Sequence, residues 1–181
     1  MLQLDVQIAP EGWDEKNEVF VEAKTTRLQL EHSLVSLSKW ESKWNKPFLS
    51  KDNKTTEETI DYIKCMTLTQ NVKQEVYDHI TQADVNKIVD YINAPMTATT
   101  FHGMNNSKRS NENVTSELIY YWMISLNIPF ECQKWHINRL LTLIRVCEMK
   151  NNPGKKMSKR QIMSQNAALN AARRKKYGTK G

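Results

Sequence analysis

Residues 115–149 read TSELIYYWMISLNIPFECQKWHINRLLTLIRVCEM, and this stretch decides the fold class. After Thr115, a good N-cap residue, apolar side chains recur at helical spacing as far as Leu126. The sequence Asn127-Ile128-Pro129 breaks this helix, and a second helical run with a broad apolar face extends from Phe130 to Met149. Two apolar helices joined by a short break predict a central helical hairpin. We therefore expect a mainly helical protein.

Shorter helical runs fill the sequence before this region. Ser33 is a good N-cap residue for a helix that must end before Pro47. Thr55 and Glu58 form a capping box, in which each side chain bonds the backbone amide of the other residue, at the start of the next helix. Two further apolar stripes follow before Pro95, and the second predicts a buried helix face of Val85, Ile88, Val89 and Ile92.

The N-terminal residues predict a different element. Residues 2–8 alternate strictly between apolar and polar side chains, which is the period of a half-buried strand. Segments 19–21 and 26–30 can supply one or two partner strands, which a stable sheet needs. The predicted fold class is therefore mainly α (α+β): a short N-terminal antiparallel β element, then a bundle of about six helices and a basic C-terminal helix.

The formal charge of +6 is divided unevenly along the 181 residues. Residues 150–181 contain ten basic residues and no acid, so residues 1–149 hold 16 bases against 20 acids. The sequence Asn151-Asn152-Pro153-Gly154 is typical of a helix stop followed by a hinge. We therefore expect two parts, an acidic and mostly helical domain with the β element over residues 1–150 and a basic helical extension over residues 151–181.

The sequence lacks the motifs of several function classes. No window approaches the roughly 18 consecutive apolar residues of a membrane span, and the first residues lack the basic start of a secretory signal. The five glycines form neither a Walker A loop nor a dinucleotide fingerprint, and no serine nucleophile elbow is present. We therefore expect no membrane association, no enzymatic activity, no catalytic residue and no cofactor.

Cysteine and histidine give no metal motif. Cys65, Cys132 and Cys147 lie among apolar residues, as reduced core cysteines of a cytosolic protein do. Cys132 and His136 lie four residues apart on a predicted helix and are the nearest approach to a ligand pair. Because two ligands do not make a tetrahedral zinc site, we expect no metal. Because the cysteines resemble reduced core cysteines, we also expect no disulfide.

Trp40 and Trp44 lie four residues apart in the sequence Lys39-Trp40-Glu41-Ser42-Lys43-Trp44, a spacing that places both on one helix face. Such a pair can close the edge of a small core, which is the more common arrangement, or can stack on bases or sugars. It can also form part of a protein–protein surface. The functional hypothesis is that Trp40 and Trp44 bind a partner protein.

The basic residues after position 150 allow three interpretations. They can bind phosphate backbones without sequence preference, dock on an acidic protein surface, or form a solvated helix end that suits the helix dipole. Apart from Tyr177 the segment has few aromatic residues, which argues against stacking on single-stranded nucleic acid. We call the following residues the basic arm: Lys155, Lys156, Lys159, Arg160, Arg173, Arg174, Lys175, Lys176 and Lys180.

Several strings resemble a family of small morphogenesis proteins of tailed bacteriophages, the tail assembly chaperone-like proteins. The strings, which together span most of the chain, are Leu30–Leu34 with Ser38–Glu41, Thr115–Met123, Ile128–Val146, Lys156–Ser158 and Asn166–Asn170. The resemblance implies a mostly helical, non-catalytic protein that works through contacts with other phage tail proteins. Its partner would be a tail component such as the tape measure protein, kept soluble until the tail tube polymerises.

Two other functions stay open on the sequence. One is a structural component of the virion, at the head–tail junction or the baseplate. The other is a nucleic-acid-binding protein that uses the basic arm. The expected location is the host cytoplasm, or the virion if the protein is a structural component. The sequence also leaves self-association open.

Overall fold

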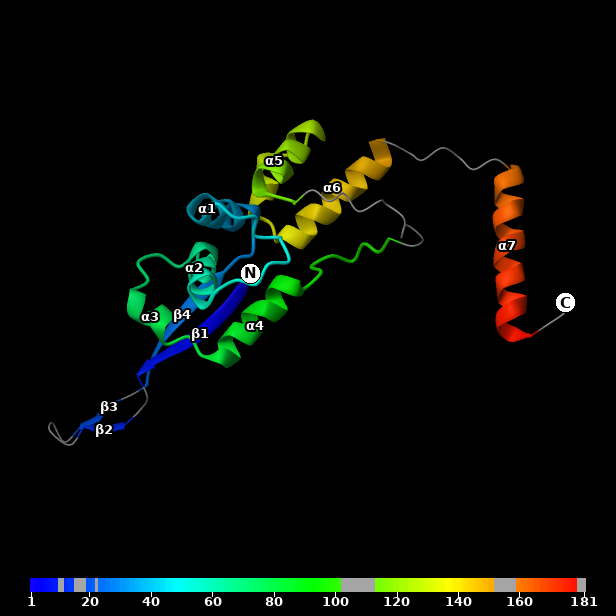
Figure 1. Cartoon of the computed structure of the whole chain (residues 1–181). Helices are drawn as coiled ribbons and strands as arrows, with labels where there is room; N and C mark the ends of the chain where they lie inside the picture. Colours follow the sequence, from blue (N-terminus) through cyan, green and yellow to red (C-terminus); the bar gives the residue numbers. More distant parts are fainter. Residues whose placement is uncertain (10–11, 15–18, 22, 102–112, 152–158, 179–181) are drawn as a thin grey trace. The chain divides into compact units, whose positions relative to one another are not determined.

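The computed structural model describes residues 1–9, 12–14, 19–21, 23–101, 113–151 and 159–178. A β-hairpin comes first and is followed by helices α1 to α7 and one 3-10 helix, η1 (Figure 1). The fold is an N-terminal two-stranded antiparallel hairpin with about seven helices, which confirms the predicted fold class. The chain divides into two compact units, Met1–Cys147 and Glu148–Gly181.

The hairpin pairs β1 (Leu2–Ala9) with β4 (Lys24–Leu30) in antiparallel register, with Leu4 opposite Leu28. Leu4 and Val6 are buried and their polar neighbours are exposed, as the alternation predicts. Two short strands, β2 (Gly12–Asp14) and β3 (Val19–Val21), pair with each other. One face of the hairpin thus contributes to the core, and both α3 and α4 contact β1.

Helices α1 (Leu34–Trp44) and α2 (Thr56–Met66) pack against each other. Both begin with the cap residues that the sequence indicates, and the predicted capping box of Thr55 and Glu58 is present. The α1 helix ends at Asn45, whose φ of 52° lies in the left-handed region that asparagine tolerates. The packing of these two helices places the side chain of Trp40 in the core.

Two helices follow, α3 (Gln74–Asp78) and α4 (Gln82–Asn93), and the predicted buried face of α4 is partly wrong. Val89 is 44% exposed and Val85 and Ile92 are only half-buried, whereas Ile88 and Tyr91 are buried. The hydroxyl of Tyr91 donates to Oε1 of Glu31 at 2.7 Å, which holds the Tyr91 side chain inward. A contact with a residue 60 positions away therefore selects the buried face.

We call the first unit, Met1–Cys147, the body. Its C-terminal half contains α5 (Ser116–Ser125), η1 (Phe130–Lys134) and most of α6 (Ile137–Asn151). The prediction of one helical run from Phe130 to Met149 is wrong, because Trp135 has extended backbone between η1 and α6. There the amide of Ile137 donates to the carbonyl of His32 at 2.8 Å, and His136 forms a β-bridge with Ser33. Pairing with the chain that follows the β-hairpin replaces a helical turn.

The partner of α5 also differs from the prediction. A central hairpin with the next helix was expected, but α5 makes its extensive contacts with α1. The second unit carries α7 (Lys159–Tyr177), the basic C-terminal helix that the sequence predicts. The side chains that the structure describes in α7 are all exposed.

Candidate partner-binding surface

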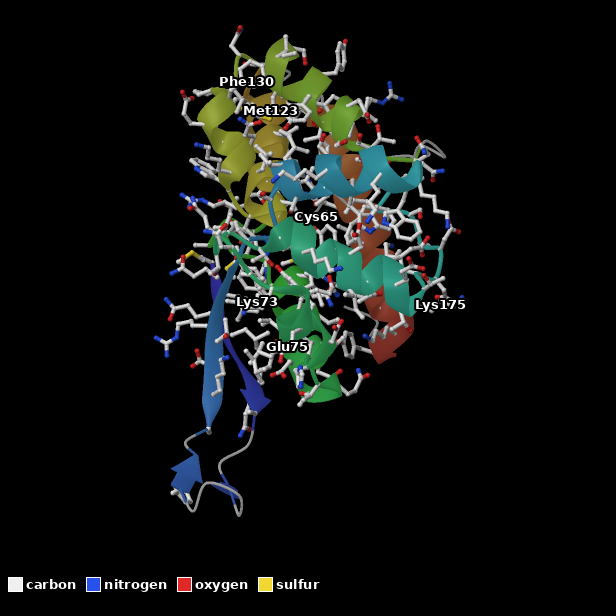
Figure 2. All side chains as sticks on the ribbon, turned by 90° about the vertical axis from the view of Figure 1, so that its left-hand side faces the viewer. Cys65, Lys73, Glu75, Met123, Phe130 and Lys175 are labelled. Carbon is white, nitrogen blue, oxygen red and sulfur yellow. The ribbon has the colours of Figure 1, made fainter. Side chains whose placement is uncertain are left out.

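Helix α5 is apolar on two sides. Ile119 and Met123 are fully buried, whereas Tyr121 and Ile124 are 63% and 60% exposed. Phe130, the first residue of η1, is 53% exposed, and Figure 2 shows it at the same end of the body as Met123. We call Tyr121, Ile124 and Phe130 the apolar patch. Tyr121 and Ile124 lie three residues apart and so share one face of α5, and exposed large apolar side chains of this kind are typical of protein interaction sites.

A tight turn fixes Phe130 relative to α5. Asn127 follows α5 with a φ of 53°, in the left-handed region. The amide of the next residue, Ile128, donates to the carbonyl of Met123 at 2.8 Å, and the Ile128 side chain is buried. Pro129 then fixes the backbone direction in which η1 begins. The apolar patch is thus held by backbone hydrogen bonds and a buried anchor rather than by a long loop.

The start of α5 is held by a carboxylate from α1. Oε2 of Glu41 accepts a hydrogen bond from the amide of Ser116 at 2.7 Å, and Oε1 accepts one from the amide of Phe48 at 2.8 Å. The Glu41 side chain is buried, and its negative charge lies at a helix N-terminus, where the helix dipole favours an anion. Glu41 therefore joins α1, the loop after it and the helix that carries most of the apolar patch.

Replacing Glu41 by alanine is expected to lower the free energy of unfolding by about 2 kcal/mol, because two amides lose a charged acceptor. Urea unfolding followed by circular dichroism measures the change. Glu117→Ala removes an exposed acid from the same first turn of α5 and is the matched control, with an expected change below about 0.5 kcal/mol. Equal losses in the two variants would contradict the assigned role of Glu41.

The structure does not place Trp40 on a surface. Its side chain is 1% exposed, its Nε1 donates to the carbonyl of Glu58 at 2.9 Å, and its ring meets that of Phe48 with centroids 5.1 Å apart. A side chain in this position cannot contact a partner while the body is folded. For Trp40 the partner-binding prediction is therefore incompatible with the packing, and the core-edge interpretation holds.

Trp44 is half-buried and is held by a polar contact. Its Nε1 donates to Oδ2 of Asp61 at 2.9 Å, and Lys43 forms an ion pair with the same carboxylate. Burial acts to raise the pKa of Asp61, but the hydrogen bonds from Lys43 and Trp44 outweigh it, so the pKa lies below its ordinary value. Trp44 thus helps to stabilise the ionised form of Asp61 by donating a hydrogen bond, and its role in partner binding stays a prediction.

The structure describes six of the nine residues in the basic arm. Lys159 and Arg160 lie in the first turn of α7, and Arg173, Arg174, Lys175 and Lys176 lie in its last turns, where Figure 2 labels Lys175. All six side chains are exposed. Lys155, Lys156 and Lys180 lie outside the described residues. The cations therefore form two clusters, one at each end of α7.

The body contains a buried pair of histidines, His32 and His136, with ring centroids 5.1 Å apart. Nδ1 of His32 forms a hydrogen bond with the Tyr62 hydroxyl, and Nε2 of His136 forms one with the carbonyl of Tyr91 at 3.0 Å. Burial, and then the neighbouring His136, lower the pKa of His32 to about 3. Burial also lowers the pKa of His136. Both rings are therefore neutral at pH 7.

These groups do not form a metal site in the part of the chain that the structure describes, where no three His, Cys, Asp or Glu side chains converge as ligands do. Cys132 lies in η1 and His136 lies beyond its end, so the two do not share the helix that the sequence predicts. The histidine rings instead bond protein groups and join the chain after β4 to the start of α6.

A hollow of about 310 Å³ lies beside Trp40, and Lys46 and Lys54 line it. Lys46 forms an ion pair with Glu58 at 2.6 Å, and Nζ of Lys54 lies 4.6 Å from the ring centroid of Phe48. Burial lowers the pKa of Lys54, although Glu58 and Asp52 act in the opposite direction. Both cations are engaged within the protein, which leaves the apolar patch as the better candidate site.

The apolar patch was not predicted from the sequence, although a signal for it exists. Between Leu118 and Leu126 every residue except Ser125 is apolar or aromatic, so these residues surround the helix instead of forming one stripe. A helix that is apolar all round must be covered all round. In this small domain α1 covers one side of α5, and Tyr121 and Ile124 on another side stay exposed. The apolar character of the whole helix circumference was therefore the sequence signal for an uncovered apolar side.

Comparison with known proteins adds no relative. The chain matches no protein family, no curated protein and no solved structure. Among the helices that the structure describes, none has both the length and the apolar character that crossing a bilayer requires.

Proposed function

We propose that this protein is a non-catalytic bacteriophage tail assembly protein, chaperone-like, that binds a tail component such as the tape measure protein. The observation that carries the proposal is the apolar patch, in which Tyr121, Ile124 and Phe130 are exposed beside a fully packed core. A rigid apolar surface of this kind suits binding of an apolar helical segment in a partner that would otherwise aggregate.

The energetics suit reversible binding. Burying one large apolar side chain contributes about 1.5 to 3 kcal/mol, and loss of translational and rotational freedom on association offsets a large part of the total from three such residues. A contact of this size holds a partner while the partner is soluble and releases it when polymerisation offers a larger interface. An assembly factor requires both steps.

The resemblance to tail assembly proteins supports the same choice of partner class. The string Thr115–Met123 contains Tyr121, and the string Ile128–Val146 contains Phe130. Two residues of the apolar patch therefore lie within the segments that carry the resemblance.

Co-expression with tail proteins of the same phage tests the proposal. We expect the chain to co-purify with one of them and to raise its soluble fraction several-fold, and we expect the double variant Tyr121→Ser with Ile124→Ser to abolish both effects. Because both side chains are exposed, the variant is expected to unfold within about 0.5 kcal/mol of the unaltered chain.

Leu68→Ser is the matched control, since Leu68 is 55% exposed and lies outside the apolar patch. It is expected to leave partner binding intact. If the double variant and the control hold the partner equally well, the apolar patch is not the binding surface. If no tail protein co-purifies and phage lacking the gene still makes full-length tails, the assembly function itself is wrong.

Mass spectrometry of purified virions separates the assembly factor from the structural component. The proposal predicts that the chain is absent from mature particles, because a chaperone-like protein leaves its partner on polymerisation. Stoichiometric recovery from virions would favour the head–tail or baseplate alternative.

A further inference from the structure

The helix α7 has the surface of a polyanion-binding element. It is 19 residues long and contains no acid, and the side chains described in it are all exposed. Its six cations form a cluster of two at the start, Lys159 and Arg160, and a cluster of four at the end, from Arg173 to Lys176. At about 1.5 Å per residue the two clusters lie roughly 20 Å apart along the axis.

The middle of α7 has two different faces. Asn166 and Asn170 lie one helical turn apart on one face, and Lys159 and Arg173 extend that face at its two ends. The opposite face carries Ala168 and Ala172. Asparagine presents both a donor and an acceptor and pairs with the exposed edge of adenine in the major groove of DNA. One face of α7 therefore combines base-reading side chains with phosphate-binding ones.

We propose that α7 binds duplex DNA by lying in the major groove, with Asn166 and Asn170 facing the base edges and the two cation clusters contacting the phosphates. Four consecutive cations at the end of the helix project around its whole circumference, so they reach the backbones on both sides of the groove. The acidic body, with 20 acids against 16 bases over residues 1–149, is repelled by DNA and leaves the contact to the helix.

The shape of α7 favours duplex DNA over other polyanions. The major groove of B-DNA is about 12 Å wide and admits an α-helix, whereas the corresponding groove of duplex RNA is too narrow for one. Single-stranded nucleic acid is bound largely by stacking on aromatic rings, and Tyr177 is the single aromatic residue in α7. This inference is independent of the proposed function, which rests on the apolar patch and not on α7.

Fluorescence anisotropy of the full chain with a labelled DNA duplex tests the inference. The key variant is Asn166→Asp with Asn170→Asp, and the matched control is Ala168→Asp with Ala172→Asp. Both pairs add the same charge at the same spacing, but on opposite faces of α7. We expect the asparagine variant to bind about tenfold or more weakly than the control, because its acids meet the base edges and phosphates of the groove. Circular dichroism confirms that both variants keep their helix content.

The salt dependence gives a second readout. With six phosphate contacts, the logarithm of the affinity is expected to fall with the logarithm of salt concentration with a slope of about five. Replacing Arg173, Arg174, Lys175 and Lys176 by glutamine is expected to reduce that slope to about two. Equal affinities of the two aspartate variants, or binding to duplex RNA or single strands as tight as to duplex DNA, would overturn the major-groove assignment.

Discussion

Replacing Trp40 by alanine is expected to lower the free energy of unfolding by about 4 kcal/mol, as truncation of a large buried side chain does. The indole is 1% exposed and makes T-shaped contacts with the rings of Phe48 and Tyr62, which stack on each other. Its removal leaves a cavity and also removes the hydrogen bond that Nε1 donates to the carbonyl of Glu58. Urea unfolding followed by far-ultraviolet circular dichroism measures the loss.

Two variants separate the contribution of the buried indole ring from that of its hydrogen bond to Glu58. Trp44→Ala removes the half-buried neighbour and is expected to cost clearly less, about 1 to 2 kcal/mol. Trp40→Phe keeps most of the ring but loses the hydrogen bond to Glu58, so its stability is expected to lie between the other two. If Trp40→Ala were as stable as Trp44→Ala, the indole would not be a core residue, and the surface prediction for Trp40 would regain support.

Acidification is expected to destabilise the body by about 1.4 kcal/mol per pH unit below pH 6.5 through His32 alone. The pKa of His32 is about 3 in the folded chain and near 6.5 in the unfolded one, so between these values only the unfolded chain binds the proton. This contribution is complete above pH 6.5 and is lost as the pH falls toward 3. Between pH 6.5 and about 4.5 it amounts to about 3 kcal/mol, and His136 adds to it.

Urea unfolding at several pH values between about 7 and 4.5 measures this dependence. Carboxylates contribute at lower pH, since the hydrogen bonds that lower the pKa values of Asp61 and Asp84 outweigh the effect of burial. His32→Gln removes the titration and is expected to flatten the pH dependence of stability. His79→Gln is the control because His79 is exposed and is expected to leave the dependence unchanged. A flat profile in the unaltered chain would contradict the burial of the histidine pair.

The features that could be predicted from the sequence depend on neighbouring residues. The caps at Ser33, Thr55, Thr81 and Thr115 act over three positions, and the alternation of β1 acts over two. Such signals need no knowledge of the tertiary fold. They were enough for the order of the elements, most helix starts and the fold class.

The features that could not be predicted depend on residues far apart in the chain. Tyr91 turns inward because the Glu31 carboxylate accepts a hydrogen bond from its hydroxyl. The helix before Ile137 is interrupted because the carbonyl of His32 accepts a hydrogen bond from the Ile137 amide. The burial of Trp40 depends in the same way on the carbonyl of Glu58. In each case a local pattern allowed two arrangements, and a partner invisible in the local sequence selected one.

The bond between Ser116 and Glu41 joins residues 75 positions apart and makes the first turn of α5 dependent on α1. Because such a bond forms only after a long loop has closed, the turn is expected to complete late in folding. In hydrogen exchange the Ser116 amide is then expected to exchange only when the body opens as a whole. Amides of the exposed α7 are expected to exchange quickly through local fraying. The two units would thus open on separate timescales, and a partner that orders α7 could be detected by the slowing of that segment alone.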